Sequence, residues 1–220
     1  MQTKSDFLSI IVVIMTDRKT PSGGPLDKAS LDLALRSLAI RLEENRTEPI
    51  ELVVCGGSAL ILTDLIARTT RDVDIVALIR RGVLCDPEPL PAFLLQATRE
   101  VSEDLRLPAN WLNNGPSRGE GGLFQMGLPD GFALRLHRRS YGPHLTVHFI
   151  DRFDQIHFKL YASADRGGYH ITDLVALAPT SDELETAARW TMTHDVSPGY
   201  AMGLKKLLRS IGHENVADRL

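Results

Sequence analysis

The chain has few cysteines, no excess of positive charge and no apolar run long enough to cross a bilayer. Its two cysteines, Cys55 and Cys85, are too few for a disulfide scaffold and indicate a reducing compartment. The formal net charge of −3 excludes a global attraction to nucleic acid or to an anionic membrane, so any such contact needs a local basic patch. We therefore expect a cytoplasmic protein that does not bind a membrane.

The most apolar run, Phe7–Met15, has about half the length that a bilayer span requires. No small-x-small cleavage pattern follows it, which disfavours a secretory signal. The run is compatible with an edge strand or with an extension ahead of a start at Met15, and whether residues 1–14 belong to the native chain stays open. We treat residues 1–24 as an N-terminal segment outside the core.

The rest of the chain has a globular composition, with 43% hydrophobic and 24% charged residues, and its length suits one domain with a helical appendage. Apolar spacing and turn residues predict an α/β or α+β core, residues 25–178, followed by a helical region, residues 179–220. We expect helices at 27–44, 59–67, 91–105, 153–164, 171–177, 181–194 and 198–212, strands at 50–55, 72–79, 132–138 and 144–150, and a long loop at 108–131.

A Gly-Gly-Ser turn and a pair of aspartates stand out in residues 53–76, VVCGGSALILTDLIARTTRDVDIV. Glycine has no Cβ, so Gly56 and Gly57 let backbone amides approach an anion, and a helix with Ser58 as its N-cap directs free N–H groups to the same place. Residues two apart on a strand point to the same face, so Asp72 and Asp74 project together and repel each other unless a cation lies between them.

These residue types match a phosphate cradle beside a metal clamp, the two parts that nucleotidyl transfer requires. A hard ion such as Mg²⁺ binds to one or two carboxylates together with substrate phosphates. Each part alone has a common structural explanation, because such a turn is more often only a turn and an Asp-x-Asp strand start is often a solvated edge. Their combination, joined by a segment of helix length, favours the functional interpretation.

The Gly-Gly-Ser turn, the intervening helix and Arg68-x-Thr70-x-Asp72-x-Asp74 resemble the signature of the DNA polymerase β-like nucleotidyltransferase superfamily. Later motifs resemble a bacterial uncharacterised subgroup related to abortive-infection-type nucleotidyltransferase toxins, and the resemblance covers about residues 28–195. These motifs are Asn110-Trp-Leu-Asn-Asn, Lys159-Leu-Tyr-Ala, Asp165-Arg166, His170-x-x-Asp173-Leu and Pro179-Thr180-x-x-Glu183-Leu.

The resemblance implies a mixed β-sheet flanked by helices, with Asp72 and Asp74 as ligands of Mg²⁺ or Mn²⁺. It places Gly57 and Ser58 at the triphosphate of an NTP substrate, Lys159 at the phosphates and Asp173 near the site. We add Gly56 to the nucleotide-binding turn and Arg71 as a second cation. Lys159 also stands out in the apolar segment IHFKLYA, where a charge needs a purpose, although snorkelling from an amphipathic helix explains it nearly as well.

Active members of the superfamily usually carry a third carboxylate on a later strand. In the predicted strand 144–150 the central polar residues are Thr146 and His148, and the nearest acid is Asp151 at its end. Asp151 either replaces the third ligand or caps the next helix, and the cap is the favoured interpretation. Trp111 in the long loop has two readings as well, because it can stack on a base or anchor the loop to the core.

Three functional hypotheses follow. The first is a metal-dependent nucleotidyltransferase that moves a nucleoside monophosphate from an NTP to a hydroxyl of RNA, a protein or a small molecule. The second is a catalytically degenerate module that binds a nucleotide or a partner without turnover. The third is a toxin–antitoxin or phage-defence component that acts through protein contacts, for example with a cognate antitoxin.

Overall fold

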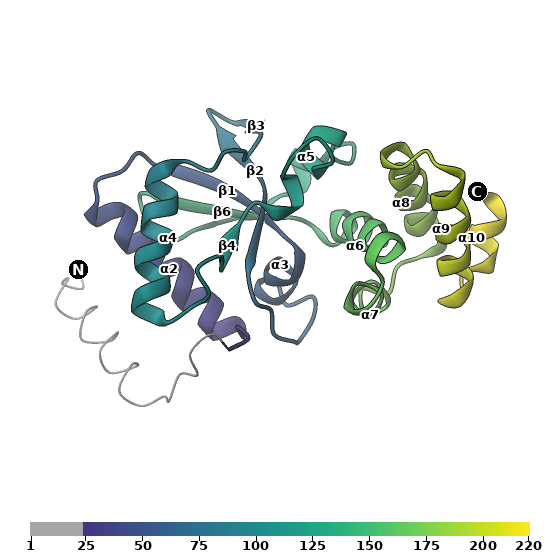
Figure 1. Ribbon diagram of the computed structural model, residues 1–220, viewed down its shortest axis with the longest axis horizontal. Helices are drawn as coiled ribbons and strands as arrows, with labels where there is room; N and C mark the ends of the chain where they lie inside the picture. Colours follow the sequence, from purple (N-terminus) through teal and green to yellow (C-terminus); the bar gives the residue numbers. More distant parts are fainter. Residues whose placement is uncertain (1–23) are drawn as a thin grey trace.

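A mixed six-stranded sheet forms the centre of the protein (Figure 1). The structure is a computed structural model and describes residues 24–220. The strands are β1 (Ile50–Cys55), β2 (Val73–Arg80), β3 (Val83–Cys85), β4 (Leu112–Asn113), β5 (His137–Ser140) and β6 (Leu145–Phe149). They lie in the order β3–β2–β1–β6–β5, with β4 beside β2. Strand β1 is antiparallel to β2 and parallel to β6, so the predicted mixed sheet is confirmed.

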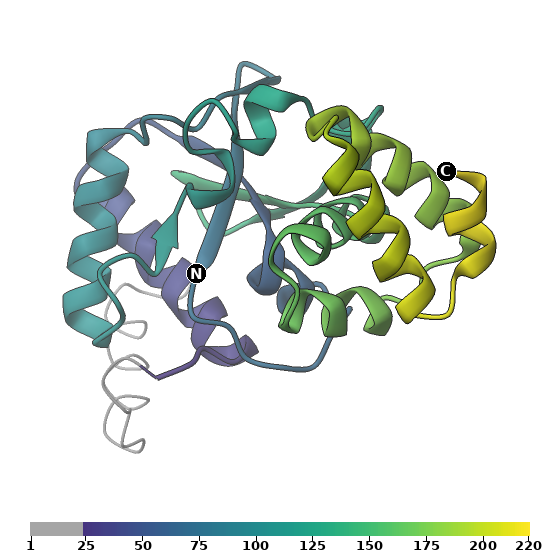
Figure 2. The ribbon, with the colours of Figure 1, turned by 45° about the vertical axis from the view of Figure 1, so that its right-hand side comes forward.

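Helices cover both faces of this sheet, which confirms the predicted α+β class (Figures 1 and 2). They are α2 (Lys28–Glu44), α3 (Gly56–Leu62), α4 (Ala92–Leu105), α5 (Leu123–Met126), α6 (Arg152–Arg166), α7 (Tyr169–Ala176), α8 (Ser181–His194), α9 (Pro198–Ser210) and α10 (Glu214–Arg219), with 3-10 turns η1 (Gly115–Ser117) and η2 (Phe132–Arg135). Helices α2 and α4 lie on one face, α6 lies on the other, and α7 to α10 continue from α6 to the C-terminus.

Alternation along β1 directs its side chains into two different cores. Leu52 and Val54 belong to the apolar cluster under α2 and α4, whereas Val53 and Cys55 belong to the cluster under α6. The leucines that recur along α2 at helical spacing, Leu31, Leu35, Leu38 and Leu42, are all fully buried, as their periodicity predicts.

The long loop 108–131 is held by Trp111 and contains β4, η1 and α5. Trp111 is fully buried in the cluster under α2 and α4, and its indole nitrogen donates to the carbonyl oxygen of Thr98 over 3.1 Å. The anchoring role of Trp111 is therefore confirmed, and its role as a stacking platform for a base is wrong.

The C-terminal helices form a third cluster with α6 and with Leu60 of α3. The Thr180-x-x-Glu183 spacing predicts a capping box, and both of its hydrogen bonds are present. Ser197 precedes Pro198 and accepts a hydrogen bond from the backbone nitrogen of Tyr200 over 3.2 Å. This third cluster contains residues on both sides of position 178. The boundary predicted there, between the core and the C-terminal helical region, stays a prediction.

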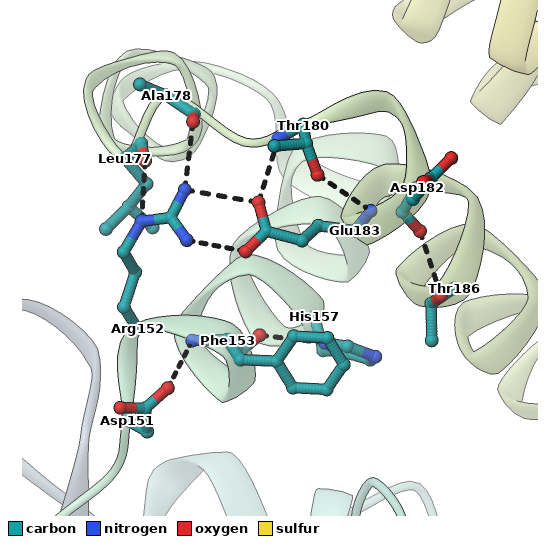
Figure 3. Close-up of polar contacts among 10 residues, drawn as sticks. All are labelled: Asp151, Arg152, Phe153, His157, Leu177, Ala178, Thr180, Asp182, Glu183 and Thr186. Carbon is teal, nitrogen blue, oxygen red and sulfur yellow. Dashed lines mark hydrogen bonds and ion pairs between the residues drawn. The ribbon is translucent and has the colours of Figure 1, made fainter.

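Arg152, the first residue of α6, joins that helix to the turn between α7 and α8 (Figure 3). Its guanidinium donates to the carbonyl oxygens of Leu177 and Ala178, each over 2.9 Å, and to both carboxylate oxygens of Glu183, over 2.6 and 3.2 Å. The same carboxylate accepts from the Thr180 nitrogen. One cation thus satisfies the carbonyls that α7 leaves free at its end and fixes the start of α8.

Two element predictions are wrong. The helix after the Gly-Gly turn begins at Gly56 and ends at Leu62, not at 59 and 67, because Asp64 takes the left-handed conformation that ends helices. Its N-cap is Cys55, so Ser58 is not the cap. Residues 132–135 form η2 instead of a strand, and β5 begins later, because Gly131 at φ 71° starts a turn that leaves Leu134 exposed while Phe132 is buried.

The edge strand or extension expected at Phe7–Met15 lies outside the described residues. Within residues 24–220, none of the helices combines the length and the apolarity that a membrane span needs.

We expect Arg152→Ala to lower the free energy of unfolding by about 1–3 kcal/mol, because the substitution removes charge-assisted hydrogen bonds from Glu183 and two carbonyls. Urea unfolding followed by circular dichroism measures the change. Arg189→Ala, which removes a more exposed ion pair with Glu185 on α8, is the matched control and should change stability by no more than about 0.5 kcal/mol. Equal losses in the two variants would contradict the role of Arg152.

Candidate active site

A cavity of about 1000 Å³ opens between the end of β1, the start of β2 and the helices α6 and α7. Six of the residues predicted for the site line it: Gly56, Gly57, Arg71, Asp72, Asp74 and Lys159. Asp173 lies directly behind this lining, in contact with Lys159. Ser58 and Asp151 do not line the cavity.

Gly56 makes room for the carboxylate of Asp74. The backbone of Gly56 has φ 68°, and a Cβ there would lie 2.8 Å from Asp74 Oδ2. Asp74 pairs with Cys55 in the register of β1 and β2, so its side chain meets the chain where β1 turns into α3. Both the conformation and the close approach require glycine at position 56.

Other side chains lie against Gly57, the next residue of the turn, and Ser58 after it is buried. A Cβ on Gly57 would lie 2.7 Å from Arg68 Nη2 and 2.8 Å from Thr70 Oγ1, so these side chains fill the space beside the glycine. Ser58 is fully buried and its hydroxyl donates to the carbonyl oxygen of Cys55 over 3.3 Å. The triphosphate roles of Gly57 and Ser58 stay predictions, and the hydroxyl of Ser58 already has a partner inside the protein.

The two aspartates stand at the start of β2, with Asp72 just before the strand and Asp74 within it. Burial first, and then the charge of Asp72, raise the pKa of Asp74 to about 6. A hydrogen bond from the side chain of Asn113 and the charges of Lys159 and Arg166 lower the pKa but do not offset the rise. The cations near Asp72 and Asp74 therefore do not neutralise the two carboxylates.

Lys159 and Arg68 meet on the buried carboxylate of Asp173. Lys159 Nζ lies 2.7 Å from Asp173 Oδ2, and its side chain is only 5% exposed. Arg68 donates from Nε and Nη2 to the two oxygens of the same carboxylate, over 2.9 and 2.8 Å. Lys159 therefore does not snorkel, because its charge is held inside the protein next to the cavity.

The cavity as a whole carries an excess of positive charge. Five cationic side chains line it, Arg68, Arg71, Arg118, Lys159 and Arg166, against three acidic ones, Asp72, Asp74 and Asp165. The full chain has the opposite balance, with a net charge of −3. Such a local excess attracts a polyanion that the rest of the surface does not.

No third carboxylate completes the site in the part of the chain that the structure describes, where no group of three metal-ligating side chains occurs. Asp151 caps α6 by accepting from the Phe153 nitrogen and pairs with His137, so the cap interpretation is confirmed. His148 on β6 pairs with Glu51 over 2.7 Å. Beyond Phe149, which pairs with Val54, the chain continues as the fully buried Ile150.

Several cavity residues carry no role in the sequence-based assignment. They are Arg68, Arg118, Arg166, Tyr169 and His170, and Asn113, which does not line the cavity but hydrogen-bonds to Asp74, has no assigned role either. Arg68, Arg166 and His170 occur in the motifs that carry the resemblance, which is the signal that could have found them. Asn113 reaches Asp74 because β4 pairs in parallel with β2, and nothing in a loop rich in glycine and proline predicts that pairing.

The carboxylate pair fits a hard divalent cation. Two oxygen-donor side chains on one cavity wall, one of them with a pKa raised by burial and by the other, form a site that gains from a bound dication. Mg²⁺ needs only one or two protein carboxylates when phosphates and water supply its other ligands. Asp72 and Asp74 are the residues that would hold it.

One protein family matches part of the chain. Residues 33–85 match the family described as nucleotidyltransferase of unknown function (DUF6036). The matched segment contains the Gly-Gly-Ser turn and both aspartates, but none of the cations on α6. No curated protein and no solved structure gives a match. The family match supports the nucleotidyltransferase superfamily, and the abortive-infection subgroup stays a prediction.

The raised pKa of Asp74 predicts a pH dependence of stability. The folded protein holds the proton of the Asp74 carboxyl more tightly than the unfolded chain does. The contribution of Asp74 to the free energy of unfolding therefore falls as the pH rises from about 4 to about 6. Asp74→Asn should remove this fall and be more stable than the wild type at about pH 7.5, by no more than about 3 kcal/mol, with little difference near about pH 4. Urea unfolding in EDTA across this range measures it.

Asp165→Asn is the matched control for that experiment. Asp165 lines the same cavity, but its side chain is 64% exposed. This variant should follow the pH dependence of the wild type. If the free energy of unfolding changed with pH in the same way for the wild type and for Asp74→Asn, Asp74 would not be held in a costly ionised state.

Proposed function

We propose that this protein is a divalent-metal-dependent nucleotidyltransferase that moves a nucleoside monophosphate from an NTP to an acceptor hydroxyl. The observation that carries the proposal is that one cavity combines an unneutralised aspartate pair with an excess of cations. An NTP bound to a divalent cation presents a positive ion and a polyphosphate chain side by side, and the two walls of the cavity match these two parts.

The residues divide into two roles. Asp72 and Asp74 would hold Mg²⁺ or Mn²⁺, which supplies Lewis acidity at the reacting phosphate when bound. Lys159, with Arg71 at the cavity surface, neutralises charge on the phosphates. In the reaction, the acceptor oxygen forms a bond to the α-phosphorus, the bond from that phosphorus to the β-phosphate side breaks, pyrophosphate leaves and the hydroxyl proton passes to water.

The acceptor is a hydroxyl of RNA, of a protein or of a small molecule. Arg71 and Arg118 extend the positive lining beyond the aspartates and favour an acceptor that carries phosphate, such as RNA. A place in a toxin–antitoxin or phage-defence system, with a cognate antitoxin as partner, rests on the resemblance alone.

The second candidate is a module that binds a nucleotide and does not turn it over. The observation that favours it is that, among the described residues, no third metal-ligating side chain joins Asp72 and Asp74 in one group. Equilibrium binding of NTPs with no transfer to any acceptor would establish this candidate in place of the enzyme.

We expect Asp72→Ala and Asp74→Ala each to reduce transfer by at least about 100-fold, because each removes a metal ligand. The assay incubates the purified protein with NTPs labelled at the α-phosphate, Mg²⁺ or Mn²⁺, total RNA and total protein. Neither variant should lose its fold, since each relieves repulsion between the acids, and EDTA should abolish transfer by the wild type.

Asp218→Ala removes an exposed carboxylate on α10 and should leave transfer unchanged. Labelling that persists in both cavity variants at the wild-type rate would exclude the aspartate pair as the metal site.

A further inference from the structure

The guanidinium of Arg68 occupies the position at which the Gly-Gly-Ser turn would otherwise meet a ligand. Its Nη2 lies 2.7 Å from where a Cβ of Gly57 would be. The side chain of Ser58 is buried behind the turn. Arg68 itself lines the cavity together with Gly57, so a cation stands beside the turn on this side.

Arg68 and Lys159 together carry more charge than their partner neutralises. Both head groups contact the single carboxylate of Asp173, which is 2% exposed and does not line the cavity. One unit of positive charge is left over on the cavity side, and a partly desolvated cation gains more from an anion than an exposed one does.

His170 gives an independent indication of a missing ligand in the same place. Its ring lines the cavity and is 9% exposed, yet its Nδ1 is buried without a hydrogen-bond partner. Burial, then the charges of Lys159 and Arg166, lower the pKa of His170 to about 4, so the ring is neutral at pH 7. A buried polar group without a partner is costly, and His170 adds such a group to the lining beside the cations.

We propose that the guanidinium of Arg68 and the ammonium of Lys159 bind the phosphate chain of the substrate, and that Asp173 is a positioning residue that holds the two cations side by side. Glycine at position 57 serves to admit the guanidinium. The identity of the phosphate chain, that of an NTP, rests on the proposed function, whereas the cationic subsite rests on the contacts of Arg68.

Isothermal titration of the full chain with sodium tripolyphosphate, without divalent ions, tests this subsite apart from catalysis. Arg68→Gln should weaken binding about tenfold or more, because a charge-assisted pair of donors is lost. Arg68→Lys should weaken it less, because the charge remains and only the two-donor fork is lost. Arg189→Gln, on the exposed face of α8, should bind as the wild type does.

Two further variants separate phosphate binding from a merely structural clamp. Asp173→Asn keeps a side-chain oxygen that can still position the two cations but removes the competing negative charge, so its affinity for tripolyphosphate should equal or exceed that of the wild type. Gly57→Ala changes no charge, yet its methyl group displaces the guanidinium and should weaken binding. If Asp173→Asn does not fold, Arg68→Gln, Arg68→Lys and Gly57→Ala decide the question.

Wild-type affinity in Arg68→Gln would overturn the proposal, as would an equal loss of affinity in Arg68→Gln and folded Asp173→Asn. A wild-type protein that does not bind tripolyphosphate would overturn it as well. The proposed function fails separately: a protein that binds tripolyphosphate through Arg68 but transfers nothing from any NTP keeps the subsite and loses the enzyme. Transfer with an unchanged KM for NTP in Arg68→Gln keeps the enzyme and loses the subsite.

Discussion

The buried carboxylate of Asp173 fixes the cationic wall of the cavity. Three elements converge on it: the segment before β2 through Arg68, α6 through Lys159, and α7 through Asp173 itself. Removing one partner from a buried ionic group leaves the others desolvated without compensation, which is far more costly than the loss of an exposed pair. The position of the cations near Asp72 and Asp74 therefore depends on the docking of α7 against α6. Arg152 supports that docking from the other end of α7, because it holds the turn that follows the helix.

The electrostatic field changes sign from one wall of the cavity to the other. The pKa of Asp74 is raised, which means that the acidic wall lacks positive charge. The pKa of His170 is lowered, first by burial and then by the charges of Lys159 and Arg166, so cations gather near this ring. Lys159 and Arg166 influence both groups, but they do not neutralise the acids. A ligand that is itself bipolar, with a metal ion at one end and phosphates along its length, matches this arrangement better than a simple anion or a simple cation does.

Local patterns in the sequence predicted the parts of the structure that local forces determine. The leucine spacing of α2, the capping box at Thr180 and the paired strands that carry Asp72 and Asp74 all follow from periods of two to four residues. The N-cap predicted at Ser58 was wrong because α3 begins at Gly56, whose left-handed backbone and close approach to Asp74 are not local patterns of the sequence. Arg68 received no role because its partner is 105 residues away, and no spacing rule connects an arginine in a turn to an aspartate on a distant helix. Asn113 was missed for a similar reason, since β4 has only two residues.

The two walls of the cavity are made at different times during synthesis of the chain. The acids belong to β2, whereas the carboxylate that organises the cations follows on α7, after most of the sheet has been translated. Because contacts of such long sequence separation form late, a nascent polypeptide that has emerged only through β2 holds two repelling acids without Lys159 and without the carboxylate that positions Arg68. The order of translation therefore delays assembly of this pocket until α7 has left the ribosome, and it separates completion of the first antiparallel strand pair, β1 and β2, from completion of the site.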